Sequence, residues 1–395
     1  MKLFVYMLIL VAACSCRPRS SLDIYQGSLE ELVVGEFILY KDVETKYIHN
    51  LRTVTEREDW VILSSYLPDN SGIVFKFYDI GSSELIRKIS IPFEGPEALK
   101  GGRGGSAFLR NEGEVILIGG NGNVGSYDSS GRKTNEWKVD FHLPSNSSEF
   151  VTMETRKGLM VECGDWIQVG QDPSNPLKNF DPKSRLMSSE FPLDFSSWLS
   201  QINLKTGQVR HSVFHIPRGY ELFQGDVLAT QLFGAVDTKR GDYYLGWPFS
   251  DTLYKLRDME LVEKLKPQTS VDFKYMPSER IAVAESSTVW MLPKEASQHI
   301  FLLYDEANDL FIRASKINES GIGETKFERT KHYVLQVFTG EWVPLGEYFF
   351  DFESVLDLEN WFLTGKGLYL NKPEQPLEDE YVFWHVDLSN SGTKN

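Results

Sequence analysis

Residues 73–91 read IVFKFYDIGSSELIRKISI. Residues 73–78 are apolar or aromatic apart from one lysine, and residues 79–84 are polar and contain a glycine. Residues 85–91 place Leu85, Arg87, Ile89 and Ile91 on one face of an extended chain. Short runs of β-branched and aromatic residues around a polar turn are typical of antiparallel hairpins. This segment therefore predicts two strands joined by a tight turn.

The same unit recurs along the chain. Predicted hairpin turns are centred near residues 81, 130, 206, 258, 307 and 340. Most of these spacings are close to about 50 residues, the length of one four-stranded blade of a β-propeller. We therefore expect one all-β domain, a six-bladed β-propeller with one unit in each blade. An open β-sandwich or two smaller β domains are the alternatives.

One interval is longer and contains residues 168–197, which are rich in Pro, Ser, Asn and Asp. Connections of that length are usually functional or disordered, so we interpret it as an insertion in the third blade. Helical periodicity is scarce, and residues 353–363 predict one short helix. Since unpaired strand edges invite aggregation, we expect residues 37–40, or the late strands 367–370 and 382–386, to close the ring.

The N-terminal residues predict export. Lys2 precedes an apolar run of about 11 residues, too short to cross a bilayer. Small residues then lead into Cys14, a pattern that resembles a bacterial lipoprotein box. We expect a signal peptide over 1–13, a lipidated tether over 14–30 that begins at Cys14, and the propeller over 31–390. An ordinary signal peptide with incidental cysteines is the alternative, and Cys16 is a weaker lipidation site.

The chain carries 56 acidic and 41 basic residues, a formal charge of −15. Nucleic acids are bound through clustered Lys and Arg, so this balance argues against a nucleic-acid partner. It also argues against adhesion to anionic lipid through protein charge, and membrane contact is expected through the lipid anchor only. The only cysteine beyond the tether, Cys163, is expected to be a small buried apolar residue and not half of a disulfide.

Several short motifs follow one another along the chain. They are the segment around Cys14, Tyr78-Asp79 before residues 85–89, EGPE at 94–97 before a glycine run, WPFSDTLY at 247–254, LYD at 303–305 with LFIR at 310–313, and GLYL at 367–370. In this order they resemble an uncharacterised domain-of-unknown-function family of Bacteroidetes lipoproteins, similar in shape to TolB-like six-bladed propellers. The resemblance covers roughly residues 30–390 and implies the fold and the export route, but no activity.

The glycine run at residues 101–105, GGRGG, lacks the Gly-Lys-Ser/Thr ending of a phosphate-binding loop. We interpret it as the crossing from the outer strand of one blade to the inner strand of the next, where glycine permits close backbone approach. The alternative is a loop that contacts a ligand, with Arg103 projecting into the central channel.

Trp247, Ser250, Asp251 and Tyr254 form a compact group after a predicted strand. An aromatic platform beside a carboxylate suits a sugar or a peptide, and Pro248 favours a rim position. The alternative is blade packing with a turn capped by Asp251.

Arg313 follows mostly apolar residues on a predicted buried strand. A buried arginine stays charged and needs a partner. It is therefore assigned either to a salt bridge that faces the channel or to the binding of an anion or carboxylate.

No motif predicts a metal or a cofactor. His211 and His215 stand four residues apart on a predicted strand, about 13 Å, too far to share one zinc ion. Residues 305–309 lack the order of a calcium loop, and neither a Gly-x-Ser-x-Gly elbow nor a His-Glu-x-x-His helix is present. We therefore expect no metal, no cofactor and no catalytic residue.

These observations predict a non-catalytic cell-envelope lipoprotein, anchored to the outer membrane on its periplasmic or its surface face, whose propeller binds a protein, a peptide or a glycan. The candidate ligand contacts are Arg103, Trp247, Ser250, Asp251, Tyr254 and Arg313. The alternative from another class is a propeller hydrolase or lyase that acts on a glycan or a lactone at the channel mouth, with Asp251 and Arg313 at its site. A purely structural envelope component is a third possibility, since the fold alone assigns no activity.

Overall fold

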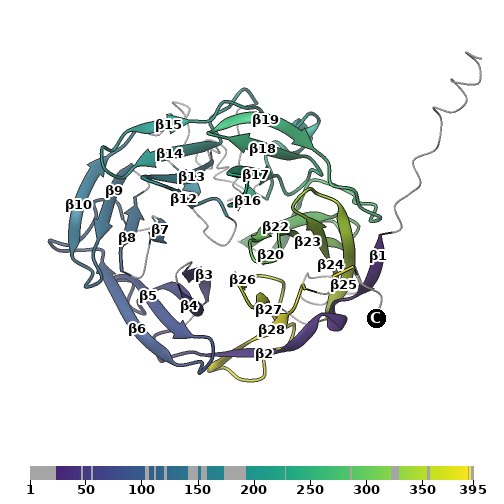
Figure 1. The fold of residues 1–395 in the computed structure, drawn as a ribbon, viewed down its shortest axis with the longest axis horizontal. Helices are drawn as coiled ribbons and strands as arrows, with labels where there is room; N and C mark the ends of the chain where they lie inside the picture. Colours follow the sequence, from purple (N-terminus) through teal and green to yellow (C-terminus); the bar gives the residue numbers. More distant parts are fainter. Residues whose placement is uncertain are drawn as a thin grey trace, which may run out of the picture.

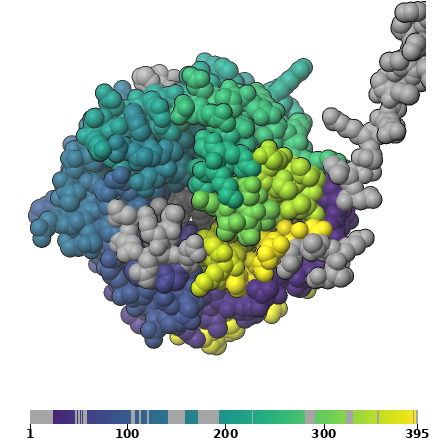
Figure 2. Space-filling view, viewed as in Figure 1, coloured from purple at the N-terminus to yellow at the C-terminus, as the bar shows by residue number. Residues whose placement is uncertain are grey.

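Six β-sheets are arranged in a ring, so the predicted six-bladed propeller is confirmed (Figure 1). The space-filling view shows neighbouring blades in contact around a face that is hollowed near its centre (Figure 2). This computed structural model describes residues 24–45, 48–54, 57–102, 106–110, 113–119, 122–140, 150–152, 158–172, 193–226, 228–284, 287–321, 329–353, 356–389 and 391–392.

The first three blades follow one another along the chain, each an antiparallel meander. Blade 1 holds β3 (His49–Val54), β4 (Arg57–Tyr66), β5 (Gly72–Asp79) and β6 (Leu85–Pro92). Blade 2 holds β7 (Ser106–Leu109), β8 (Val115–Ile118), β9 (Asn123–Tyr127) and β10 (Lys133–Lys138). Blade 3 holds β11 (Phe150–Thr152), β12 (Val161–Cys163), β13 (Trp166–Asp172), β14 (Leu199–Asn203) and β15 (Val209–His211).

Blade 4 is also a consecutive meander, whereas blades 5 and 6 each combine late strands with one strand from the N-terminal segment. Blade 4 holds β16 (Phe233–Asp237), β17 (Asp242–Gly246), β18 (Leu253–Arg257) and β19 (Glu260–Leu265). Blade 5 holds β22 (Gln298–Asp305), β23 (Leu310–Ser320), β24 (Thr330–Thr339), β25 (Pro344–Phe352) and the N-terminal β1 (Tyr25–Ser28). Blade 6 holds β26 (Trp361–Thr364), β27 (Gly367–Asn371), β28 (Glu380–Val386) and the N-terminal β2 (Val33–Tyr40).

Elements outside the blades are short. The hairpin of β20 (Glu279–Ala284) and β21 (Ser287–Met291) lies between blades 4 and 5 along the chain. The 3₁₀ helix η1 (Leu29–Glu31) joins β1 to β2, and η3 (Tyr220–Phe223) lies between blades 3 and 4. Among the residues described, no helix has the length and hydrophobicity of a transmembrane segment.

The chain ends close the ring as expected. β2 pairs antiparallel with β28 from Val33↔Val386 to Tyr40↔Glu380 and so forms the outer strand of blade 6. β1 pairs in parallel with β25, which joins the same N-terminal segment to blade 5. Residues 25–30, inside the stretch 14–30 that the sequence predicts as a tether, therefore belong to the folded body.

Two predicted units occupy one blade. The turns near residues 307 and 340 are the β22–β23 and β24–β25 hairpins of blade 5, so the prediction that each marks its own blade is wrong. The sixth blade comes instead from β26, β27, β28 and β2. The predicted number of six blades is nevertheless right, because two errors cancel. Blade 5 contains two of the predicted hairpins, and blade 6 contains none.

Three other sequence predictions have clear outcomes. The glycine run lies between β6 and β7, which confirms a crossing between blades; residues 103–105 lie outside the described part of the chain. The predicted insertion begins too early, because residues 168–172 are part of β13, and its residues 173–192 also lie outside the described part. The predicted helix is wrong, because its described residues contain no helix and include the start of β26.

Each blade packs face to face on its neighbours. Six clusters of buried apolar side chains lie one in each interface between successive blades. Val115 and Leu117 of β8 point towards blade 1, whereas Ile116 and Ile118 point towards blade 3. A strand buried on both faces needs a continuous apolar run in place of alternation, which explains the sequence VILI at 115–118.

The two faces of the ring differ in their connections. In each blade the chain runs from the innermost strand to the outermost one. The connections after the first and third strands therefore lie on one face of the ring. The connection after the second strand lies on the other face, together with the segments that lead from one blade to the next. The first face, here the hairpin face, carries short turns such as 80–84 and 258–259. The other, here the long-loop face, carries the described parts of the long connections, which are 93–102, 193–198, 212–226 and 266–284.

Ring closure predicts unequal effects of two substitutions on β2. Phe37 is 4% exposed and packs among Phe362, Tyr369 and Phe383, whereas Val34 is 60% exposed. We expect Phe37→Ala to lower the free energy of unfolding by about 3–5 kcal/mol, and Val34→Ala, the matched control, by less than about 0.5 kcal/mol. Urea denaturation of both variants measures this, and equal losses would contradict a stabilising role of closure.

Candidate functional site

The structure places five of the six candidate ligand contacts in blades 4 and 5. Trp247, Ser250 and Asp251 lie on the connection between β17 and β18, Tyr254 lies on β18, and Arg313 lies on β23. Arg103 lies outside the described residues.

Trp247 and Tyr254 are core residues. Both are 0% exposed, and their ring centroids lie 4.6 Å apart in the cluster between blades 3 and 4. Phe214 packs edge-on against both rings. The prediction that these two residues form an aromatic platform for a ligand is therefore corrected, because neither ring reaches the surface.

Ser250 holds the turn before β18. Its backbone N–H donates to Trp247 O (3.3 Å), and its hydroxyl accepts from the N–H of Thr252 (3.1 Å). The sequence offered, as an alternative to ligand binding, a turn capped by Asp251. The structure shows that Ser250 makes this turn contact instead. This leaves the carboxylate of Asp251 free to point elsewhere.

Asp251 belongs to a hydrogen-bonded row that ends inside blade 5. Its Oδ1 accepts a short hydrogen bond from the hydroxyl of Tyr275 and lies 3.4 Å from His299 Nε2. His299 Nε2 lies 2.6 Å from the Tyr275 hydroxyl, and Nδ1 lies 2.7 Å from Ser315 Oγ. Tyr275 donates its one hydroxyl proton to Asp251, so towards His299 Nε2 its oxygen can only accept. The neutral imidazole therefore carries its proton on Nε2, and its Nδ1 accepts a hydrogen bond from the Ser315 hydroxyl.

The charges in this row are set by burial and by Arg313. Burial raises the pKa of Asp251, but hydrogen bonds from His299 and Tyr275 and the charge of Arg313 outweigh it and lower that pKa to about 2. Burial and the charge of Arg313 lower the pKa of His299 to about 4. Burial and the charge of Asp251 raise the pKa of Tyr275. At neutral pH the row therefore holds one carboxylate, a neutral imidazole and a phenol.

Arg313 begins a second polar row that runs across blade 5. The sheet register pairs it with Gln336 on β24, which in turn pairs with Glu347 on β25. Arg313 Nε donates to Gln336 Oε1 (2.9 Å), and Gln336 Nε2 donates to Glu347 Oε1 (2.9 Å). Glu347 also accepts from Thr269 Oγ1 (2.6 Å) and from the N–H of Ser270 (3.1 Å).

The guanidinium of Arg313 is 0% exposed, and its two terminal nitrogens have no hydrogen-bond partner among the residues that the structure describes. The rings of Phe273 and Phe338 lie 5.8 Å from its Cζ, near the outer limit of a cation–π contact. Asp251 and Glu347 supply compensating charge, although neither pairs with it directly. Within the described part of the chain Arg313 makes no salt bridge, contrary to the channel-facing pair that the sequence offered, and its unused N–H groups would suit a neutral oxygen acceptor.

Residues 266–278, here the strap, cover both rows. Along it Val271, Phe273 and Tyr275 are partly buried while Asp272 and Lys274 are exposed. Phe273 packs edge-on against His299, with ring centroids 4.8 Å apart. The strap thus closes the interface between blades 4 and 5 from the long-loop face.

Asp251, His299 and Ser315 are connected in the order of a catalytic triad. Unlike the serine of such a triad, however, Ser315 is not accessible to a substrate. Ser315 is 0% exposed and His299 1% exposed, whereas Asp251 has a third of its side chain exposed. A nucleophile must reach a substrate carbonyl, and Ser315 reaches only the interior. This arrangement can lock blade 5 to blade 4, and only its Asp251 end can meet a ligand.

Sequence reasoning missed Tyr275, His299, Gln336 and Glu347. Gln336 and Glu347 interrupt apolar runs at register positions opposite Arg313, and that signal was readable only with β23, β24 and β25 placed in one blade. Tyr275 and His299 lie far from Asp251 in sequence, and no local pattern joins them.

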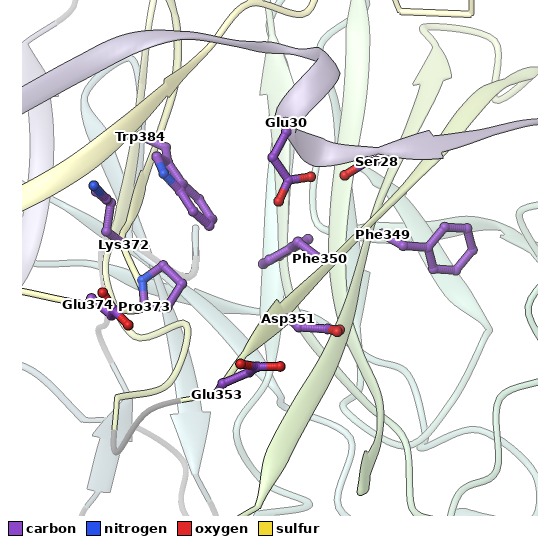
Figure 3. Close-up of a pocket in the computed structure, with 10 residues that line it drawn as sticks. All are labelled: Ser28, Glu30, Phe349, Phe350, Asp351, Glu353, Lys372, Pro373, Glu374 and Trp384. Carbon is purple, nitrogen blue, oxygen red and sulfur yellow. The ribbon is translucent and has the colours of Figure 1, made fainter.

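A separate pocket lies in the seam between blades 5 and 6 (Figure 3). Its volume is about 430 Å³. This seam pocket is lined by Ser28, Glu30, Phe349, Phe350, Asp351, Glu353, Lys372, Pro373, Glu374 and Trp384. Among the residues that the structure describes, no group of His, Cys, Asp and Glu side chains is placed to hold a metal ion.

The comparisons with known proteins concern the fold. No family model matches the chain, and no curated protein matches it in sequence. A DUF4221 family member from Bacteroides vulgatus is structurally similar, with a TM-score of 0.63 and 13% identity over 90% of this chain and 97% of that chain. The expected resemblance to a domain-of-unknown-function family is thus confirmed in the fold.

Two further solved structures are less similar. BamB from Moraxella catarrhalis has a TM-score of 0.36 at 10% identity, over 83% of this chain and 70% of that chain. A luciferin-regenerating enzyme has a TM-score of 0.43 at 9% identity, over 91% of this chain and 98% of that chain. At these scores neither similarity bears on the function of this chain.

The buried imidazole predicts a pH dependence of stability. Because the pKa of His299 falls from 6.5 to about 4 on folding, the unfolded chain binds more protons between those values, and stability decreases as the pH drops through them. This one group contributes up to about 3 kcal/mol over that window. We expect His299→Gln to flatten the unfolding free energy between pH 6.5 and 4 in urea titrations.

The matched control is Asn371→Ala, because Asn371 is buried, hydrogen-bonded and carries no titratable group. It should lower stability at every pH in this range and leave the slope between pH 6.5 and 4 at the wild-type value. A wild-type slope in His299→Gln would show that another group titrates in this window.

Proposed function

We propose that this protein is a non-catalytic envelope lipoprotein whose propeller binds a protein, a peptide or a glycan on its long-loop face. The observation that carries the proposal is the asymmetry of the connections: short hairpin turns occupy one face, and the long connections, described over 93–102, 193–198, 212–226 and 266–284, lie on the other. Binding residues are commonly placed on loops held by a rigid scaffold.

The burial of the polar rows supports binding over catalysis. His299, Arg313 and Ser315 are enclosed between blades 4 and 5, and the strap covers them. Asp251 is the partly exposed end of the rows on the long-loop face. A carboxylate on a rigid support can hydrogen-bond the hydroxyl or amide groups of a glycan or a peptide.

The attachment is proposed from sequence alone. Cleavage before Cys14 and acylation of its thiol would place the tether at the start of β1, which is bonded to blade 5. The propeller would then be held at the outer membrane by acyl chains, with no protein charge needed. The proposal covers either location, the periplasmic or the cell-surface face of that membrane.

Replacing residues 173–192 by a short Gly-Ser linker tests the binding face. The deletion spares β13 and the buried Phe195 and Trp198, so we expect a melting temperature near that of wild type. The ligand is first identified on glycan arrays or by affinity capture from envelope extracts. We expect the deletion to weaken the affinity for this ligand at least tenfold. Lys205→Ala on the hairpin face is the control, and wild-type binding by the folded deletion variant would refute a role of this connection.

A hydrolase or lyase remains the second candidate because Asp251 is ionised, partly exposed and backed by His299 and Arg313. Its test is a screen of glycan and lactone substrates with wild type and Asp251→Asn. If this carboxylate works in catalysis, turnover should fall by about 10²-fold or more. Turnover that is unchanged in Asp251→Asn removes this site from consideration.

A further inference from the structure

The seam pocket is distinct from the two polar rows. Its lining comes from β25 of blade 5, from β28 of blade 6 and the connection before it, and from β1 and η1. We propose that it binds a small organic cation, an alkylammonium or trimethylammonium group with a short apolar body.

The charge of the pocket sets the sign of the ligand. Among the residues described, no cationic group pairs with the carboxylates of Glu30, Glu353 or Glu374. The pocket's single lysine, Lys372, is already engaged outside the cavity, since its Nζ bonds Glu36 Oε1 at 2.7 Å. The lining therefore has a surplus of negative charge that is open to a cation.

Asp351 is the fourth carboxylate of the lining and differs from the other three. Its Oδ1 lies 2.8 Å from His332 Nδ1 on the neighbouring strand. It therefore adds to the negative potential while its geometry is fixed by another residue. The three carboxylates without such a partner are the ones left to contact a ligand.

An aromatic wall adds a second recognition element. Trp384 is partly buried and packs edge-on against Phe350 and Phe352, with ring centroids 6.5 Å apart in both pairs. Figure 3 shows its indole and the carboxylates of Glu30 and Glu353 arranged around the same space. An indole face beside carboxylates is the combination that recognises ammonium groups.

The size and spacing of the lining favour an organic cation over a metal ion. A volume of about 430 Å³ is within the range of small-molecule sites and far exceeds one metal ion. Calcium needs six to eight converging oxygen ligands, and the described acidic residues form no group placed to hold a metal. The acids line a cavity and do not converge on a point.

Titration calorimetry at low ionic strength tests the proposal with defined probes. Choline and n-butylammonium should bind, and sodium butyrate, of similar size and opposite charge, should not. A blocked Gly-Lys-Gly peptide is a further arm: tighter binding than n-butylammonium would identify the cation as a lysine side chain of a partner, and weaker binding would identify a free amine.

Two variants and one control locate the site. We expect Trp384→Leu, and the double change Glu30→Gln with Glu353→Gln, each to weaken choline binding by about fivefold or more. The control is Glu378→Gln. Glu378 is exposed and lies on the connection between β27 and β28, as Glu374 does, but it does not line the pocket. This variant should bind choline as wild type does. If Trp384→Leu does not fold, the double variant carries the test alone, because both glutamates are exposed.

Three results would overturn the proposal. They are equal binding of butyrate and butylammonium, choline binding that survives in the folded double variant, and displacement of choline by stoichiometric calcium. Each measures the seam pocket only, so a failure here leaves the proposed long-loop face untouched.

Discussion

Pairing of β2 with β28 is the interaction on which the rest of the structure depends. A ring of blades leaves a free sheet edge at each chain end unless the two ends share a sheet. Here the register from Val33↔Val386 to Tyr40↔Glu380 joins residues from opposite ends of the chain. The chain then enters blade 1 past Asp42, whose carboxylate accepts from the fully buried Lys76 at 2.6 Å. The N-terminal segment is thus hydrogen-bonded to blade 6 through β2 and to blade 1 through Asp42.

Once the ring is closed, every blade has two buried faces. This explains the continuous apolar run of β8, and why the apolar side chains divide into one cluster for each interface. The packing also fixes backbone positions where two blades nearly touch. Gly158 has a φ of +66°, and a Cβ there would lie 1.8 Å from Gly234 O of blade 4. A side chain at this position is excluded by the neighbouring blade and not by the local turn alone.

The interface between blades 4 and 5 combines this packing with buried polar rows. Tyr275 of the strap contacts both the Asp251 carboxylate of blade 4 and the neutral His299 imidazole of blade 5, and these contacts tie the two blades to one relative placement. Removing one member of such a network leaves an uncompensated polar group, which costs more than the loss of one hydrogen bond. The rows therefore hold the strap and Asp251 in fixed positions on the long-loop face. A rigid, partly exposed carboxylate is a suitable contact for a ligand.

The sequence by itself determined the strands, the hairpin turns and the all-β class, because alternation and turn residues act over a few neighbouring positions. It also identified Asp251 and Arg313 as charged residues in a packed setting. Only the tertiary structure decided that the turns near 307 and 340 share blade 5, that Trp247 and Tyr254 are core, and that Asp251 meets His299. These outcomes depend on which sheets become neighbours after closure, and the same local pattern of residues fits more than one neighbour.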